Sequence, residues 1–386
     1  MKSLLDLMDD ELHRLPLPLK YTSVSEFIND DESSATFIRD LLKDDDFQTP
    51  DKASDIYDFA KTRARHSAIT FLMGLVFRRF AGIFPLIPQT ATLPTHSDKK
   101  TSDQALRMWL ITSLYHDKAY YSEHIKSGSL DYRKTFKYFL LTDDYSDERL
   151  ECILNYRHNC PRAFAHTYAN ILSYDQYARN YHAREKDSIE KVDHGILGGV
   201  IVFNDLVRKS FKLPKSTEEL PAIKACCLTI AQHNIFKSDS AQRDKLYPSD
   251  LSYLYHDTDF RIERTTPLLL FLCLVDTLEC VKRFSKGENE KTSLQTMTVL
   301  SSINISVTQD TIIIDYAKLR KRIKEKNNPA FTSNYERYYD GIRNLHEWTA
   351  FYATARNDKP DEITITFIKP KQQSAVHKDL AFSGGV

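Results

Sequence analysis

Apolar residues recur at helical spacing over most of the first 293 residues. Residues 51–79 predict a long helix that becomes apolar after His66, and residues 105–123 predict a second helix that runs into the adjacent pair His116-Asp117. Further apolar helices are predicted from His194 onward, over 220–236 with His233 at the end, and over 267–284 with Asp276 in the middle. The pattern therefore predicts a mainly α protein.

The pattern changes after residue 293. Segments 303–307 and 311–316 are rich in β-branched residues and are separated by a short polar stretch, which predicts a hairpin. Residues 362–368 predict one more strand, and helical patterns cover 318–326 and 334–352. We therefore expect 294–370 to form a small α+β lobe, followed by a flexible tail over 371–386.

The same pattern suggests how the rest of the chain is divided. Residues 1–50 read as short amphipathic segments broken by prolines, and we expect this N-terminal helical extension to pack on the main domain. Residues 51–293 form the predicted helical domain. Its polar stretch, about 124–190, is either an insertion that roofs a pocket or a surface helical pair, and the pattern leaves both readings open.

Composition supports a folded helical protein. Hydrophobic residues make up 41% of 386 residues, and only 10 Gly and 14 Pro are present, which favours long helices over a turn-rich all-β fold. The six cysteines form no CxxC pair and are expected to be buried thiols.

Charge and hydropathy restrict the partners. The formal net charge is zero, so a nucleic-acid partner is not implied by charge, although a local basic patch stays an open alternative. The N-terminus carries acidic residues where a signal peptide would be basic, and no run of about 18 uncharged apolar residues occurs. We therefore expect a cytoplasmic protein with no membrane partner. The oligomeric state cannot be inferred.

Six side chains that end or interrupt apolar helices are candidate metal ligands: His66, His116, Asp117, His194, His233 and Asp276. They are distant in sequence apart from the adjacent pair, so only a helical bundle would bring them together. Imidazole and carboxylate donors suit Zn, Mn, Fe or Ni and require no thiolate. A single histidine near an apolar face is more often a hydrogen-bonded core residue, and Asp276 has Arg261, Arg264 and Lys282 as alternative partners.

The order of these residues resembles the HD-domain superfamily. The resemblance rests on the segments RHSAITFLMGL, TSLYHD, DHGILGGVIV, IAQHN and LLLFLCLVDTLE, and it covers about residues 55–285. It implies an HD-domain-like helical bundle in which His66, His116, Asp117 and Asp276 hold one metal ion. His194 and His233 would bind a second ion, with Asp117 as the bridge. The chain departs from the family in reading Lys118-Ala119 after the pair, where many members have Gly-Lys, and His233-Asn234 where some have His-His.

The resemblance also implies an activity. Most HD-like proteins are phosphohydrolases, so we expect hydrolysis of a nucleotide or nucleic-acid phosphoester by a metal-activated water, with one or two divalent transition metal ions (Mn, Fe, Zn or Ni, with Mg as a further option). Asp117 and Lys118 are the expected catalytic residues, and Lys191 and Arg162 are further candidates for stabilising phosphate charge. Two alternatives stay open: a di-iron oxygenase, which has the same ligand order, and a non-catalytic protein with a degenerate HD lobe that senses a nucleotide or binds a partner.

Overall fold

The computed structural model describes residues 1–15, 20–42, 63–78, 104–118, 262–279, 281, 295–308, 311–325, 353–359 and 361–367, with isolated helical residues at 194, 195, 198, 199, 202, 226, 227, 229, 230 and 233. The chain divides into two compact units: unit 1 contains Met1–Ile87 and Leu270–Val386, and unit 2 contains Pro88–Leu269. The described residues are mostly helical and include one small antiparallel sheet, which agrees with the predicted class.

The helices of the described residues have the following bounds: α1 Leu4–Leu12, the 3-10 helix η1 Val24–Glu26, α2 Asp31–Leu42, α4 Ala64–Phe77, α5 Gln104–Tyr115, α14 Ile262–Leu278, α16 Thr296–Leu300 and α17 Ala317–Glu325. Helix α5 belongs to unit 2. The boundary between the units falls within α14, so the C-terminal part of that helix belongs to unit 1.

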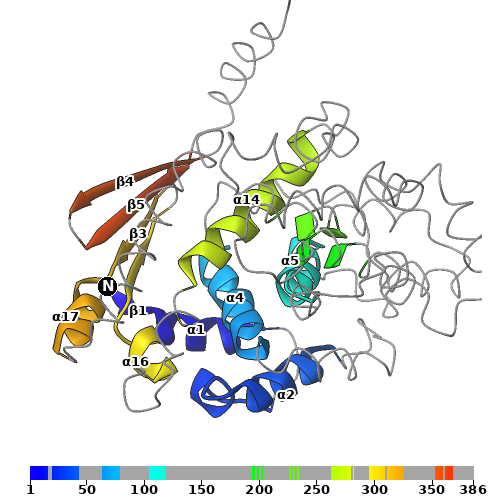
Figure 1. Cartoon of the computed structure of the whole chain (residues 1–386), viewed down its shortest axis with the longest axis horizontal. Helices are drawn as coiled ribbons and strands as arrows, with labels where there is room; N and C mark the ends of the chain where they lie inside the picture. The colour runs from blue at the N-terminus through cyan, green and yellow to red at the C-terminus, as the bar shows by residue number, and fades with distance from the viewer. Residues whose placement is uncertain are drawn as a thin grey trace, which may run out of the picture. The chain divides into compact units, whose positions relative to one another are not determined.

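The sheet lies in unit 1 and contains strands from both ends of the sequence (Figure 1). Its order is β1 (Lys2–Ser3), β2 (Asn304–Val307), β3 (Thr311–Asp315), β5 (Glu362–Phe367) and β4 (Ala353–Lys359), and each neighbouring pair is antiparallel. The predicted β2–β3 hairpin pairing and the predicted strand at 362–368 are therefore present. Strands β1 and β4 were not predicted.

Alternation along the strands explains which face of the sheet is buried. Ile312 and Ile314 of β3 are fully buried, whereas Ile313 between them is only partly so. Ile314 pairs with Ile305 on one side and Ile363 on the other, and Ile312 pairs with the buried Ile365. Because successive side chains point to opposite faces, these isoleucines form one continuous apolar face.

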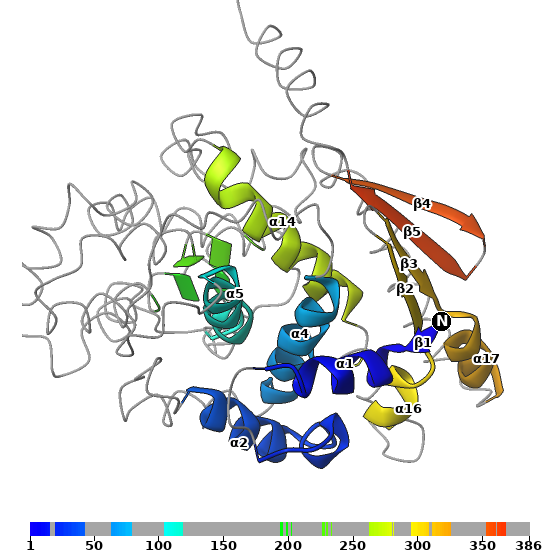
Figure 2. The ribbon, with the colours of Figure 1, turned by 180° about the vertical axis from the view of Figure 1, so that it is seen from behind.

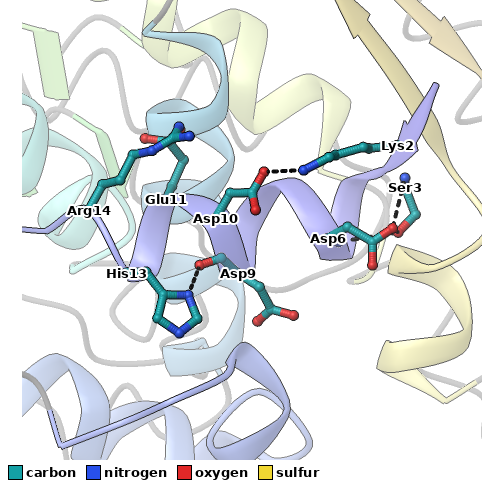
Figure 3. Close-up of polar contacts among 8 residues, drawn as sticks. All are labelled: Lys2, Ser3, Asp6, Asp9, Asp10, Glu11, His13 and Arg14. Carbon is teal, nitrogen blue, oxygen red and sulfur yellow. Dashed lines mark hydrogen bonds and ion pairs between the residues drawn. The ribbon is translucent and has the colours of Figure 1, made fainter.

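The N-terminus is fixed by short-range polar contacts (Figure 3). The Ser3 hydroxyl accepts the backbone N–H of Asp6 at 3.2 Å, and the Asp6 carboxylate accepts the backbone N–H of Ser3 at 3.2 Å, which is a capping box. Lys2 pairs with Asp10 at 2.8 Å, and this interaction lowers the pKa of the Asp10 carboxyl. The capping residue therefore ends β1 and starts α1.

Helices α1 and α2 both pack against α4 (Figures 1 and 2). Every residue of α4 from His66 to Phe77 is buried, as expected for a helix that is apolar nearly all round. The Asp31 carboxylate of α2 accepts the backbone N–H of Arg65 at 3.1 Å, so a residue of α2 satisfies a donor in the first turn of α4. The next residue in this turn is His66.

Several predicted segments lie outside the described residues: the start of the 51–79 helix, the 124–190 stretch, the 334–352 helix and the 371–386 tail. The predicted domain boundaries stay predictions. Within the part of the chain that the structure describes, no helix combines the length and apolarity needed to cross a membrane.

Candidate metal centre

In unit 1, His66 contacts two carboxylates. It lies in the first turn of α4 and is 5% exposed, and its Nε2 atom is 3.1 Å from Oδ1 of Asp276. Its other ring nitrogen, Nδ1, is 2.8 Å from Oε2 of Glu279. Asp276 lies within α14, and Glu279 follows one turn later, directly after the helix. The structure therefore brings together two of the six predicted ligands here and adds a carboxylate that was not predicted.

In unit 2, the pair His116-Asp117 lies directly after α5, which ends at Tyr115. Both side chains are buried, at 0% and 7% exposure. The Nδ1 atom of His116 is 2.8 Å from the backbone carbonyl of Ser113, three residues earlier. A carbonyl oxygen only accepts hydrogen bonds, so Nδ1 carries a proton and Nε2 is the nitrogen left to bind a cation.

His233 repeats this arrangement. Its Nδ1 atom donates to the carbonyl of Ile230 at 2.7 Å, and its ring lies 5.4 Å from that of His116 and 5.1 Å from that of His194, centroid to centroid. His194 and His233 are buried at 7% and 1% exposure. Two of the three imidazoles are therefore held in the same tautomer by local backbone.

The three imidazoles converge on one carboxylate oxygen. Oδ1 of Asp117 lies 3.2 Å from Nε2 of His194, 3.6 Å from Nε2 of His116 and 3.9 Å from Nε2 of His233. Asp117, His194 and His233 each offer one donor atom, and these atoms all lie within 4.8 Å of one another. The structure thus brings together the four predicted ligands of unit 2, which are His116, Asp117, His194 and His233.

These separations match donor atoms around a single ion. Two donors that each bind a zinc-like ion at about 2.1 Å in tetrahedral geometry are about 3.4 Å apart, and the three Asp117 distances lie on either side of that value. The 3.1 Å between His66 and Asp276 fits the same geometry. The buried histidine and aspartate groups could therefore hold a metal ion.

Protonation of the imidazoles stabilises this group of side chains less well than a metal ion would. His116 and His233 already use Nδ1 as a donor, so a proton on Nε2 as well would make both rings cationic. Two neighbouring cations in a buried site repel each other and lose hydration, and one carboxylate compensates only part of that cost. A divalent cation shared by neutral imidazoles avoids this repulsion.

The other predicted residues near the site have different settings. Lys118 is half-buried after α5, its backbone N–H donates to the carbonyl of Tyr115 at 3.0 Å, and its Nζ lies 5.2 Å from the centre of the Tyr115 ring. Arg162 and Lys191 lie outside the described residues, as do the side chains of the alternative Asp276 partners Arg261, Arg264 and Lys282.

Cysteines contribute nothing to the described donor groups. Cys226, Cys227 and Cys273 are buried thiols, as predicted, and Cys226 donates to the carbonyl of Met108 at 3.6 Å. Burial raises the pKa of the Cys226 thiol to about 12, which keeps it protonated at neutral pH. The donor sets that the structure describes therefore contain nitrogen and oxygen only.

Glu279 is the site residue that sequence reasoning missed. Its exposure is 0%, and it follows Asp276 by three residues, a spacing that places both carboxylates on one helical face. A second acidic residue in the predicted apolar helix was the signal that could have identified it.

Comparison with known proteins finds no relative: no family model, curated protein or solved structure matches the chain.

Proposed function

We propose that this protein is a metal-dependent phosphohydrolase or phosphodiesterase that acts on a nucleotide or nucleic-acid phosphoester. The observation that supports it best is the convergence of three imidazole Nε2 atoms on Oδ1 of Asp117, with two of the rings held by backbone carbonyls. Such a donor set suits a divalent transition metal. The choice of phosphoester hydrolysis comes from the resemblance to the HD-domain superfamily.

The proposed ligand assignment follows that resemblance. By that resemblance, His66, His116, Asp117 and Asp276 would hold one ion, and His194 and His233, together with Asp117, would hold a second. Nitrogen and oxygen donors without thiolate favour Mn, Fe, Zn or Ni. A divalent ion in such a site supplies an activated water as the nucleophile and neutralises charge on the phosphate under attack.

The remaining steps depend on side chains of this chain. Asp117 would help to orient the attacking water, because the resemblance makes its carboxylate a ligand of both ions. Lys118, the next residue, is proposed to stabilise the negative charge that develops on the non-bridging phosphate oxygens. Burial of the histidines and aspartates limits access of bulk water and so strengthens these electrostatic interactions.

The test is metal analysis followed by a hydrolysis screen. The purified protein is expected to contain close to one or two equivalents of transition metal, and Mn-supplemented protein should release phosphate or a nucleotide from at least one member of a panel of mononucleotides, cyclic dinucleotides and single-stranded oligonucleotides. A metal-loaded protein that hydrolyses none of these would contradict the proposal.

A matched histidine variant controls for side-chain loss. His233→Ala should lose metal and activity, whereas His13→Ala should retain both. The His13 ring also donates through Nδ1 to a backbone carbonyl, that of Asp9 at 2.7 Å, but it is exposed and outside the donor groups. Oxygen uptake by iron-loaded protein, or metal binding without turnover, would favour the oxygenase or the sensor instead.

A further inference from the structure

Glu279 combines complete burial with two hydrogen bonds to N–H donors. Its Oε2 atom accepts from Nδ1 of His66 at 2.8 Å, and its Oε1 atom accepts from the backbone N–H of Val281 at 2.6 Å. Its own backbone N–H donates to the carbonyl of Val275 at 2.9 Å, so its main chain continues the hydrogen bonding of α14. The carboxylate is thus held from both sides.

An ionised carboxylate at Glu279 satisfies both contacts. Both neighbours donate, and only a carboxylate offers an acceptor on each of its two arms. An amide in the same place has one acceptor and one donor. It would therefore either leave one contact donor against donor or require the His66 proton to move from Nδ1 to Nε2. Only the acidic group satisfies both contacts while keeping the proton on Nδ1.

The bond to Nδ1 also determines what the far side of the ring can do. When the Nδ1–H donates a hydrogen bond to the Glu279 carboxylate, a neutral ring keeps its lone pair on Nε2, the atom that faces Asp276 at 3.1 Å. Metal-bound histidines commonly donate their other ring N–H to a carboxylate, which fixes the tautomer and the ring orientation. A buried carboxylate also destabilises the fold unless its charge is compensated, so a role in packing alone does not account for it.

We infer that Glu279 is a positioning residue that orients His66 as a metal ligand through Nε2. The inference rests on the proposed function, since it requires that His66 binds metal. Glu279 itself does not bind the ion. It holds the imidazole in the tautomer and orientation that present Nε2 beside Asp276.

Metal affinity of Glu279→Gln tests the inference. The dissociation constants for Mn and Zn are measured by titrating the metal-free full-length chain with each ion. The variant is expected to raise the dissociation constant by about 10–100-fold, because the glutamine amide either donates to Nδ1 and moves the proton to Nε2, or opposes the Val281 N–H. Saturating metal should still fill the same number of sites.

Glu11→Gln is the matched control. Glu11 is also a buried carboxylate in unit 1, at 1% exposure, and its charged contacts are Arg14 at 2.9 Å and Arg78 at 3.6 Å. Its variant is expected to bind metal within about twofold of wild type. Thermal denaturation in chelator reports whether either variant changes the stability of the metal-free fold, which is how a merely structural role would show itself.

A measurement on the wild-type chain tests the inference even if the variant does not fold. Nitrogen-15 NMR of the zinc-loaded protein should show His66 with a proton on Nδ1 and zinc on Nε2. Zinc on Nδ1, or an unchanged dissociation constant in a folded Glu279→Gln variant, would overturn the inference and leave the proposed function standing. Wild-type protein that binds neither Mn nor Zn would overturn both.

Discussion

Nε2 of His194 lies 3.2 Å from Oδ1 of Asp117, and both side chains are buried. This contact joins residues from two segments that are distant in sequence, and it is shorter than the distances from the same oxygen to Nε2 of His116 and of His233. Asp117 therefore has the central place in the unit 2 group, and its replacement is the most direct test of metal binding there.

Asp117→Asn should abolish most metal binding at this group. The amide keeps the shape of the side chain but removes the negative charge that offsets the cation, so we expect metal affinity to fall by more than about 100-fold and hydrolysis to fall at least as far. Calorimetric titration and the phosphate-release assay measure the two effects. The metal-free variant should be as stable as metal-free wild type or more so, because a buried charge is lost. Wild-type affinity in the variant would remove Asp117 from the ligand set.

The N-terminus of α2 offers a test of a local interaction. Ser33 donates its backbone N–H to Asp30 at 2.8 Å, and this bond is the main reason that the pKa of the Asp30 carboxyl lies below its ordinary value of 3.8. Asp30→Ala should lower the free energy of unfolding by about 1 kcal/mol at neutral pH. Urea denaturation measures the change.

The same pKa shift gives the sign of a pH dependence. A depressed folded-state pKa contributes stability above the unfolded-state pKa, and this contribution is lost as pH falls through the folded-state pKa. The difference between wild type and Asp30→Ala should therefore shrink between about pH 5 and pH 2. Asp30→Asn is the control, since it keeps a capping acceptor without a titrating group. A difference between wild type and Asp30→Ala that is constant across this range would contradict the prediction.

Cys226 should not react with thiol reagents in the folded protein. Burial raises its pKa to about 12, so almost no thiolate is present at neutral pH and the sulfur is inaccessible. Iodoacetamide labelling followed by peptide mass spectrometry should find the Cys226 peptide unmodified in native buffer and modified in concentrated urea. Rapid labelling under native conditions would show that the surroundings of Cys226 open readily.

The sheet allows a comparison of adjacent isoleucines. Ile314→Ala should lower the free energy of unfolding by about 2–5 kcal/mol, because a fully buried side chain is truncated. Ile313→Ala removes the same atoms from the partly exposed face, and its cost should stay below about 1 kcal/mol. Equilibrium denaturation of both variants measures the contrast. Equal losses would mean that the assigned alternation is wrong.

Local pattern was enough to predict much of this structure. The apolar spacing before His116 predicted a buried helix with that residue and Asp117 at its end, and both lie there. The apolar run around Asp276 likewise predicted a buried carboxylate. These features depend on side chains within a few turns of one helix, so the information lies in a short stretch of sequence.

Features that depend on distant partners could not be predicted in this way. Strand β1 has two residues and is a strand only because it pairs with β2, and β4 reads ATARNDK, without apolar alternation. The role proposed for Glu279 depends on its contact with His66, which belongs to another helix. The roles of the six proposed ligands stay predictions until metal binding is measured.

The pairing of Lys2 with Ile305 also has a consequence for biosynthesis. About 300 residues separate the two, so at about 5–20 residues per second the ribosome needs roughly 15–60 s to make the partner of the first strand. Throughout that interval residues 2–3 have no partner with which to form a strand. Slowing or stalling translation before residue 304 should therefore leave the N-terminal segment unpaired and accessible to chaperones for longer.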